Sequence, residues 1–317
     1  MRLSHLTTRS RSRAAAILLA LWALFVLSAM VISWALDINT RLTISSAANR
    51  LLEAEAEACS GAEVAMNPAV KPNSQVLRGS LAPNQSYEAR MTGEGGRLNL
   101  NLILQSMLSN PAPNNPYLEL LQRYLEMKGV ELNERDHMID TLLDWVDPDN
   151  LVRLNGAEDE PGYKPANALL KSMDELKRVR GWQEFTARPN WDNDFTLNSQ
   201  DPKIDINWAS RDVLLSLPGM TEGLVDRFLA IRRGPDDLEG TDDDVLFTSP
   251  APGGDVQIAM GLRGDQFAPL AVLITTTDPV MRVVSVGKSG NVTRTVRLVV
   301  FKQGPAIRLI PGTWKEF

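Results

Sequence analysis

The chain has 317 residues, 44% of them hydrophobic, and a formal net charge of −6. Its single cysteine, Cys59, excludes an internal disulfide, and we expect it to be a small packing residue. Without the four arginines that precede the first apolar stretch the charge is −10, which argues against a nucleic-acid ligand, because phosphate binding needs clustered Lys and Arg.

The first element is an uncharged stretch of 23 residues, Ala14–Leu36. As a helix it would be roughly 35 Å long, enough to cross a hydrocarbon core of about 30 Å. Only arginines, and no acid, precede it, so we expect the N-terminus in the cytoplasm and the bulk of the chain outside. A cleaved secretory signal is the alternative, but the apolar run is long for one and no clean A-x-A site follows it.

The apolar stretch leads directly into a second helical segment. Residues 37–66 contain no Gly or Pro before Gly61 and are rich in Ala, Leu and Glu, which are strong helix formers. We therefore predict one unbroken helix from the membrane to about Met66.

Strand patterns follow the long helix and return near the C-terminal end. Alternation predicts a hairpin of Tyr87–Met91 and Arg97–Asn101 around a turn at Gly93–Gly96, and a short strand at Gln75–Leu77. Later strands are predicted at Ala271–Thr277, Met281–Val286 and Val292–Phe301. The early and late strands should form one sheet packed on the long helix.

Between these strands the periodicity is helical. One helix is predicted at Tyr117–Lys128. A second is predicted to begin after a cap at Asn133, and a third at Ser172–Val179. The chain is therefore predicted to be α+β, with a long N-terminal transmembrane helix packed on an antiparallel sheet and a large all-helical inserted domain.

A first acidic loop follows the second of these helices. Six carboxylates lie within 17 residues on backbone broken by Pro and Gly: Asp144, Asp147, Asp149, Glu158, Asp159 and Glu160. Hard oxygen ligands on such a loop suit Ca²⁺, although the D-x-x-D-x-D spacing is not that of an EF-hand. The alternative is a solvated acidic loop whose aspartates serve turns and caps.

A second acidic loop, Gly234–Asp244, surrounds a glycine turn. Its carboxylates are Asp236, Asp237, Glu239, Asp242, Asp243 and Asp244. The same two interpretations apply, a metal site or a solvated surface.

Two short helices are predicted on either side of Leu217-Pro-Gly-Met220. This segment resembles a helix-hairpin-helix, as found in membrane-anchored DNA receptors, which are the alternative functional class. Its acids and bases balance between Asp205 and Arg233, and Thr221 stands where the motif has its second glycine. We interpret it as a structural hairpin.

Enzyme signatures are weak. The two histidines are His5 and His137, and the sequence has no G-x-S-x-G, H-E-x-x-H or phosphate-loop motif. We predict that the chain is not an enzyme; a metal hydrolase built from the acidic loops is the alternative.

The N-terminal region resembles a known family. Arg13-Ala14-Ala15 is similar to the junction that prepilin peptidase cuts, which implies cleavage between Ala14 and Ala15, where most members have Gly in place of Ala14. Most pilin-like subunits carry a Glu that pairs with the N-terminal amine of the next subunit, and this chain has Leu19 there. In lacking this Glu, the chain is similar to the K-type minor pseudopilin of type II secretion, which is a tip subunit.

Other motifs carry the same resemblance. E-x-G-x-L-N-L-N at Glu94–Asn101, D-W-x-D-x-D at Asp144–Asp149 with a later G-A-E-D and Tyr163, and I-N…L-P-G at Ile206–Gly219 resemble K-type segments, though Glu160–Tyr163 replaces the usual Y-Y pair. The second loop resembles the calcium loop of major pseudopilins. The resemblance implies structural Ca²⁺ on Asp144, Asp147, Asp149, Glu158 and Asp159, and on Asp236, Asp237, Glu239, Asp243 and Asp244.

The pattern and the resemblance imply this organisation: a prepilin leader at 1–14, a transmembrane helix at 15–36, its continuation at 37–66, a pseudopilin α+β domain from 67–101 and 268–302, an inserted helical domain at 102–267, and a tail at 303–317. The implied role is to promote pseudopilus assembly and protein export across the outer membrane. The implied location is the bacterial inner membrane, crossed once, with the N-terminus cytoplasmic and the C-terminal bulk periplasmic. Implied partners are the I, J and H types, the major pseudopilin and prepilin peptidase, with methylation of the new N-terminus and no nucleic acid.

Overall fold

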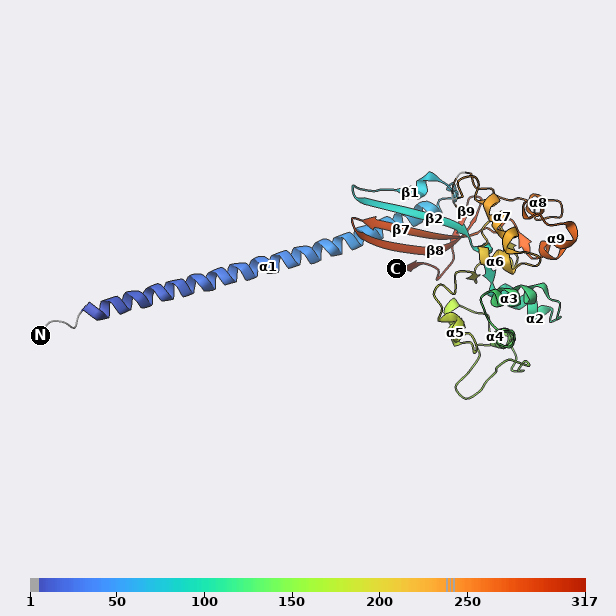
Figure 1. Ribbon diagram of the computed structural model, residues 1–317, viewed down its shortest axis with the longest axis horizontal. Coiled ribbons are helices and arrows are strands. Elements are labelled where there is room, and N and C mark those ends of the chain that lie inside the picture. Colours follow the sequence, from blue (N-terminus) through green and yellow to red (C-terminus); the bar gives the residue numbers. More distant parts are fainter. Residues whose placement is uncertain (1–5, 238, 240, 242) are drawn as a thin grey trace.

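One long helix projects from a body made of a sheet and a group of shorter helices (Figure 1). The structure is a computed structural model that describes residues 6–237, 239, 241 and 243–317. Helix α1 runs from Leu6 to Met66 without interruption, as predicted. Within the described residues it is the one helix long and apolar enough to cross a membrane, and its most apolar window has a mean hydropathy of 2.7.

The C-terminal part of α1 packs tightly on the sheet. Four alanines on one helix face have no exposed surface: Ala54, Ala58, Ala62 and Ala65. Their small side chains let the backbones approach so closely that a Cβ on Gly287 would overlap the carbonyl of Ala54 and the backbone of Ala58. At the end of the helix, Lys302 Nζ donates to the carbonyls of Ala65 (3.2 Å) and Asn67 (2.8 Å). These contacts fix α1 to the sheet.

The sheet joins strands from both ends of the chain. Its order is β1 (Arg78–Gly79), β2 (Gln85–Gly93), β7 (Val280–Ser289), β8 (Val292–Gln303) and β10 (Lys315–Glu316), and β9 (Ala306–Leu309) also pairs with β8. All pairs are antiparallel, with Glu88 opposite Val286 and Val286 opposite Thr295. The predicted union of early and late strands on the long helix is confirmed, and the predicted tail at 303–317 supplies β9 and β10.

The predicted hairpin of Tyr87–Met91 and Arg97–Asn101 is wrong. Strand β2 pairs with β7, and the short β3 (Leu98–Asn99) pairs in parallel with β4 (Phe195–Thr196). The chain turns helical at once, because the Asn99 side chain accepts a hydrogen bond from the backbone N–H of Leu102 and caps the next helix. The predicted strand at Gln75–Leu77 is a 3₁₀ turn, η1.

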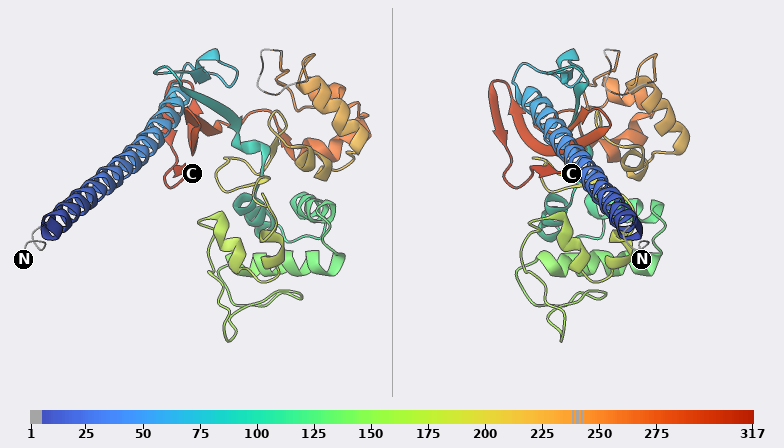
Figure 2. Two further views of the ribbon diagram at one scale, coloured as in Figure 1. Left: turned by 60° about the vertical axis from the view of Figure 1, so that its left-hand side comes forward. Right: turned by 90° about the vertical axis from the view of Figure 1, so that its left-hand side faces the viewer.

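The insertion between β2 and β7 is mostly helical. Its elements are η2 (Glu94–Gly96), α2 (Leu100–Ser109), α3 (Pro116–Met127), α4 (Leu132–Val146), η3 (Met173–Arg178), α5 (Gln183–Thr186), α6 (Arg211–Ser216), α7 (Glu222–Arg232), α8 (Asp255–Met260) and α9 (Gly264–Ala271). A parallel pair, β5 (Ile204–Asp205) and β6 (Ile274–Thr275), lies near its end. One apolar core runs from Leu98 to Ile274. Figure 2 shows the helices gathered at the end of the sheet away from the free end of α1.

Three local predictions in this region need correction. Helix α4 begins at Leu132 after Glu131, and not after a cap at Asn133. The predicted helix at Ser172–Val179 is the 3₁₀ segment η3. The predicted strand at Ala271–Thr277 shrinks to β6, because α9 occupies the chain as far as Ala271.

Candidate metal site

Helix α4 carries the first acidic loop on its C-terminal end. The inward face of the helix is apolar: Met138, Ile139, Leu142 and Leu143 are buried. The next residue, Asp144, has no exposed surface, and the helix ends at Val146. The apolar core therefore fixes the position of the first carboxylate.

Three acidic side chains are buried together in this loop. Asp144, Asp147 and Glu158 are 0%, 3% and 5% exposed. Nη1 of Arg153 donates to Oδ1 of Asp144 at 2.5 Å and also contacts Oδ2 of Asp147. The backbone N–H of Arg153 donates to Oδ2 of Asp144 at 3.3 Å. One guanidinium therefore bridges two of the three carboxylates.

The third carboxylate has no such partner. Among the described residues, neither oxygen of Glu158 has a hydrogen-bond donor, and the same holds for Oδ1 of Asp147. Burial, followed by the charges of Asp144, Asp147 and Asp149, raises the pKa of Glu158. Burial also raises the pKa of Asp147, in spite of its contact with Arg153. Buried oxygens without donors are costly, so this cluster has a shortage of positive charge and of donors.

The rest of the loop is held firmly against α4. Nδ1 of His137 lies 2.6 Å from the carbonyl of Asn155, whose backbone N–H donates to Asp140 at 3.1 Å. The ring of Tyr163 lies 6.0 Å from that of Trp145. A Cβ on Gly156 would overlap Oδ2 of Asp144, so glycine is needed for this close approach. Loop and helix thus form one compact unit around the carboxylates.

The structure brings together three of the five ligands predicted for this loop. Asp149 and Asp159 are exposed at its surface, and Oδ1 of Asp149 accepts from the N–H of Leu151 in a turn. Across the described part of the chain, no three His, Cys, Asp or Glu side chains are already arranged around a common metal position. The oxygens of Asp144, Asp147 and Glu158 nonetheless fit a hard cation, because they are buried and partly without donors.

The second acidic loop receives much of its countercharge from the C-terminal end of α7. Oε1 of Glu239 accepts from Nη2 of Arg232 at 2.8 Å, and Asp237 lies 3.4 Å from Arg233. Asp243 accepts from the Thr241 hydroxyl at 2.7 Å and from the N–H of Asp236 at 3.1 Å. Burial opposes ionisation of Glu239, but Arg232 and Arg233 outweigh it and lower its pKa. Leu238, Gly240 and Asp242 lie outside the described residues.

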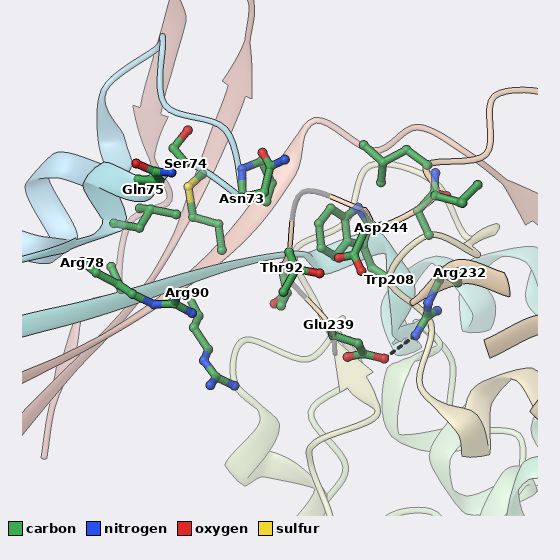
Figure 3. Close-up of a pocket in the computed structure, with 18 residues that line it drawn as sticks. Asn73, Ser74, Gln75, Arg78, Arg90, Thr92, Trp208, Arg232, Glu239 and Asp244 are labelled. Carbon is green, nitrogen blue, oxygen red and sulfur yellow. Dashed lines mark hydrogen bonds and ion pairs between the residues drawn. The ribbon is translucent and has the colours of Figure 1, made fainter. Parts of the chain in front are cut away.

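This second loop borders a cavity. The cavity of about 340 Å³ lies between the loop and β1 and β2, and Asp244 is part of its lining. Figure 3 shows the Glu239–Arg232 pair at its rim, across from Arg78 and Arg90. Metal binding by Asp236, Asp237, Glu239, Asp243 and Asp244 stays a prediction.

The hairpin of α6 and α7 is built as a structural element. Gly219 takes a left-handed φ of 79° at the Leu217–Met220 turn. Arg232 is 7% exposed and donates through Nη1 to the carbonyls of Ile206 (3.0 Å) and Ala209 (2.7 Å). Arg211 pairs with Asp226 at 3.0 Å. With these arginines engaged inside the protein, a DNA-binding role is not favoured.

The sequence analysis missed Arg153 as a member of the site. Its signal was present, since it is the single basic residue between Asp144 and Glu160. Of the predicted N-terminal positions, Ala14 and Ala15 lie within α1, and the Leu19 side chain is exposed along that helix. Cleavage between Ala14 and Ala15 stays a prediction.

The fold thus combines one membrane-length helix with an antiparallel sheet on which the C-terminal part of that helix packs. The fold is similar to a chain in a crystal structure described as the GspK-GspI-GspJ complex of the enterotoxigenic Escherichia coli type 2 secretion system. The TM-score is 0.53 and the identity 14%, over 89% of this chain and 99% of that chain.

The sequence comparisons are more specific. Residues 96–188 match a family described as "Type II secretion system (T2SS), protein K". A relative named Type II secretion system protein K, from Klebsiella pneumoniae, is 30% identical over 125 residues. That alignment covers 32% of this chain and 38% of the relative. Residues 96–188 are thus similar to protein K of type II secretion, and the chain as a whole shares the fold of the matched structure.

Proposed function

We propose that the protein is the tip subunit of a periplasmic pseudopilus, where it promotes pseudopilus assembly and protein export. The observation that carries the proposal is the position of the helical insertion, which covers the end of the sheet farthest from the free end of α1 (Figure 1). A subunit in the body of a fibre must leave that end open for the next subunit. A bulky insertion there, together with Leu19 in place of the pairing Glu, suits a subunit at the end of the fibre.

The anchor supports the same role. Residues 15–36 of α1 are exposed along their whole length and uncharged, which suits lipid contact. The arginines before them favour a cytoplasmic N-terminus and a periplasmic body. Processing by prepilin peptidase and methylation of the new N-terminus belong to this proposal.

Partners are proposed to pack along α1 beyond the membrane segment. Several apolar side chains there are left uncovered by the sheet: Ile38, Leu42, Ile44 and Leu52. Helices of the I and J types would cover them, and the H type and the major pseudopilin would follow in the fibre. Large apolar side chains that a helix leaves exposed in this number are typical of an interaction surface.

A structural Ca²⁺ ion is the proposed cofactor of the helical insertion. Asp144, Asp147 and Glu158 would hold it, with Asp149 at the rim. The ion would supply positive charge that cross-links buried carboxylates. The residues themselves anchor the loop to the end of α4, so the site holds the shape of the insertion and has no catalytic role.

The partner proposal can be tested with the full chain in detergent. Co-expression with the I and J types should yield a stable complex, and Leu42→Glu should abolish it and reduce export in cells. Leu81→Glu is a matched control, because Leu81 has the same 64% exposure but lies between β1 and β2. A wild-type chain that neither co-purifies with these partners nor restores export would refute the proposed function.

A further inference from the structure

Arg153 occupies the place where the acidic cluster most needs a cation. Its guanidinium lies between Asp144 and Asp147, with Nη1 2.5 Å from Oδ1 of Asp144. The Arg153 side chain is 30% exposed, whereas those of the two carboxylates are 0% and 5% exposed. The arginine therefore reaches from the surface into a buried acidic pocket.

One guanidinium cannot satisfy this pocket. It reaches one oxygen of Asp144 and one of Asp147, and it leaves Glu158 without a donor among the described residues. Glu158 is 5% exposed and experiences the charges of both aspartates. A divalent cation carries twice the charge and accepts six to eight oxygens without a fixed fork geometry. A divalent cation that binds Oδ1 of Asp144 or Oδ2 of Asp147 therefore competes with Arg153 for these oxygens.

The segment that carries Arg153 is unusual in composition. Its neighbours Leu151, Val152 and Leu154 are 76%, 59% and 97% exposed. Three large apolar side chains on one exposed loop are costly in water unless another state or contact covers them. The backbone N–H of Arg153 and its Nη1 both donate to Asp144, so a cation that takes over this carboxylate also frees the backbone between these residues.

We propose that Arg153 is a built-in competitor for the divalent-cation site, and that cation binding releases Arg153 and repositions the apolar segment 151–154. The inference rests on the structural cation proposed above. Arg153 keeps the carboxylates together while no cation is bound, and it lowers the apparent affinity of the site. The loop then has two arrangements, selected by which cation the two aspartates hold.

The test is calcium titration of the full-length protein in detergent micelles, followed by calorimetry. Arg153→Gln should bind Ca²⁺ about tenfold more tightly than wild type, which corresponds to about 1.4 kcal/mol of removed competition. Arg153→Lys keeps the charge and should stay close to wild type. Arg180→Gln is the matched control, because Arg180 pairs with Glu160 on the same loop at 2.8 Å and should leave the affinity unchanged.

A second measurement follows the loop itself without changing Arg153. In a Cys59→Ser background, Leu154→Cys is labelled with an environment-sensitive fluorophore, and Ca²⁺ should change its emission. Adding Glu158→Gln to this reporter should abolish that change.

The possible failures are distinguishable. Equal or weaker Ca²⁺ binding by Arg153→Gln, or an equal gain in Arg180→Gln, overturns the competition. A silent fluorophore at position 154 overturns the loop movement. Absence of binding in wild type overturns this inference and the proposed cofactor together, while co-purification with the I and J types tests the pseudopilus role independently.

Discussion

Glu94 joins the sheet to the helical insertion through a buried ionic network. It has no exposed surface, and its oxygens accept from Arg282 at 2.7 and 2.8 Å, from the Thr196 hydroxyl at 2.6 Å and from Arg97 at 3.2 Å. Burial opposes its ionisation, but Arg282 and Arg97 prevail and lower its pKa. Strand β7, segment η2 and strand β4 thus meet at one carboxylate.

We expect Glu94→Gln to destabilise the protein by about 3 to 5 kcal/mol, because it leaves two buried guanidinium groups poorly paired. Urea unfolding followed by fluorescence measures the loss. Glu88→Gln is the control: Glu88 lies 3.5 and 3.7 Å from two exposed arginines, and such surface pairs contribute about 1 kcal/mol or less. Equal losses in both variants would contradict the network.

Asp205 makes the protein less stable as pH rises, whereas a carboxylate in an ion pair makes it more stable as pH rises. It is 1% exposed, and burial, with a contribution from Asp278, raises its pKa to about 7. The folded state therefore binds more protons than the unfolded state between pH values of roughly 4 and 7, and this group's contribution to stability falls as pH rises through that range.

Asp205→Asn should remove this loss of unfolding free energy at high pH. The loss is at most about 4 kcal/mol for a pKa raised from 3.8 to about 7. Its melting temperature should exceed that of wild type at pH 8 and approach it at pH 4. Exposed Asp226 provides the control, since Asp226→Asn should follow the wild-type curve. Parallel curves for wild type and Asp205→Asn from pH 4 to 8 would show that Asp205 is not the group responsible.

At the scale of elements, the contact of α1 with β7 depends on the absence of a side chain at Gly287. We expect Gly287→Ala to push the helix away from the sheet and to lower stability by about 1 to 3 kcal/mol, as overpacking does. Gly223→Ala in α7 is the control, because a Cβ there meets open space. Thermal melting compares them; a neutral Gly287→Ala would mean that the helix can shift without cost.

The long elements could be predicted from sequence because their signals are local. An uncharged stretch followed by strong helix formers specifies α1, and β7 and β8 are joined by a tight turn. The early hairpin failed for the opposite reason: β2 finds its partner almost 190 residues later, and no local pattern records that pairing. Asn99 also caps α2, which ends the strand after two residues.

The candidate site was predictable in composition and not in arrangement. Carboxylate density pointed to the loop, and Asp144, Asp147 and Glu158 are buried there. Which acids are buried depends on how α4 ends and on how closely Gly156 approaches Asp144, both of which are tertiary facts. In the second loop, Arg232 and Arg233 come from α7 and its end to pair with acids.

At the scale of the whole molecule, the metal site should stabilise the helical insertion. Binding to the folded state alone adds about 2.7 kcal/mol when the ligand is a hundredfold above its Kd. Chelation should therefore lower the melting temperature, and the double variant Asp147→Ala with Glu158→Ala should lose this sensitivity. Mg²⁺ should substitute poorly, because it prefers a tight octahedron and retains its waters. Identical calorimetric scans with Ca²⁺ and with chelator would contradict a structural ion.

The pairing of β2 with β7 also sets an order of events during biosynthesis. Helix α1 rests on β2, β7 and β8, yet the ribosome makes β7 and β8 only after the whole insertion. Until then the buried alanine face of α1 has little to cover it. The nascent chain therefore spends most of its synthesis with this face of α1 uncovered, and transiently exposed apolar surface of that kind is prone to aggregation.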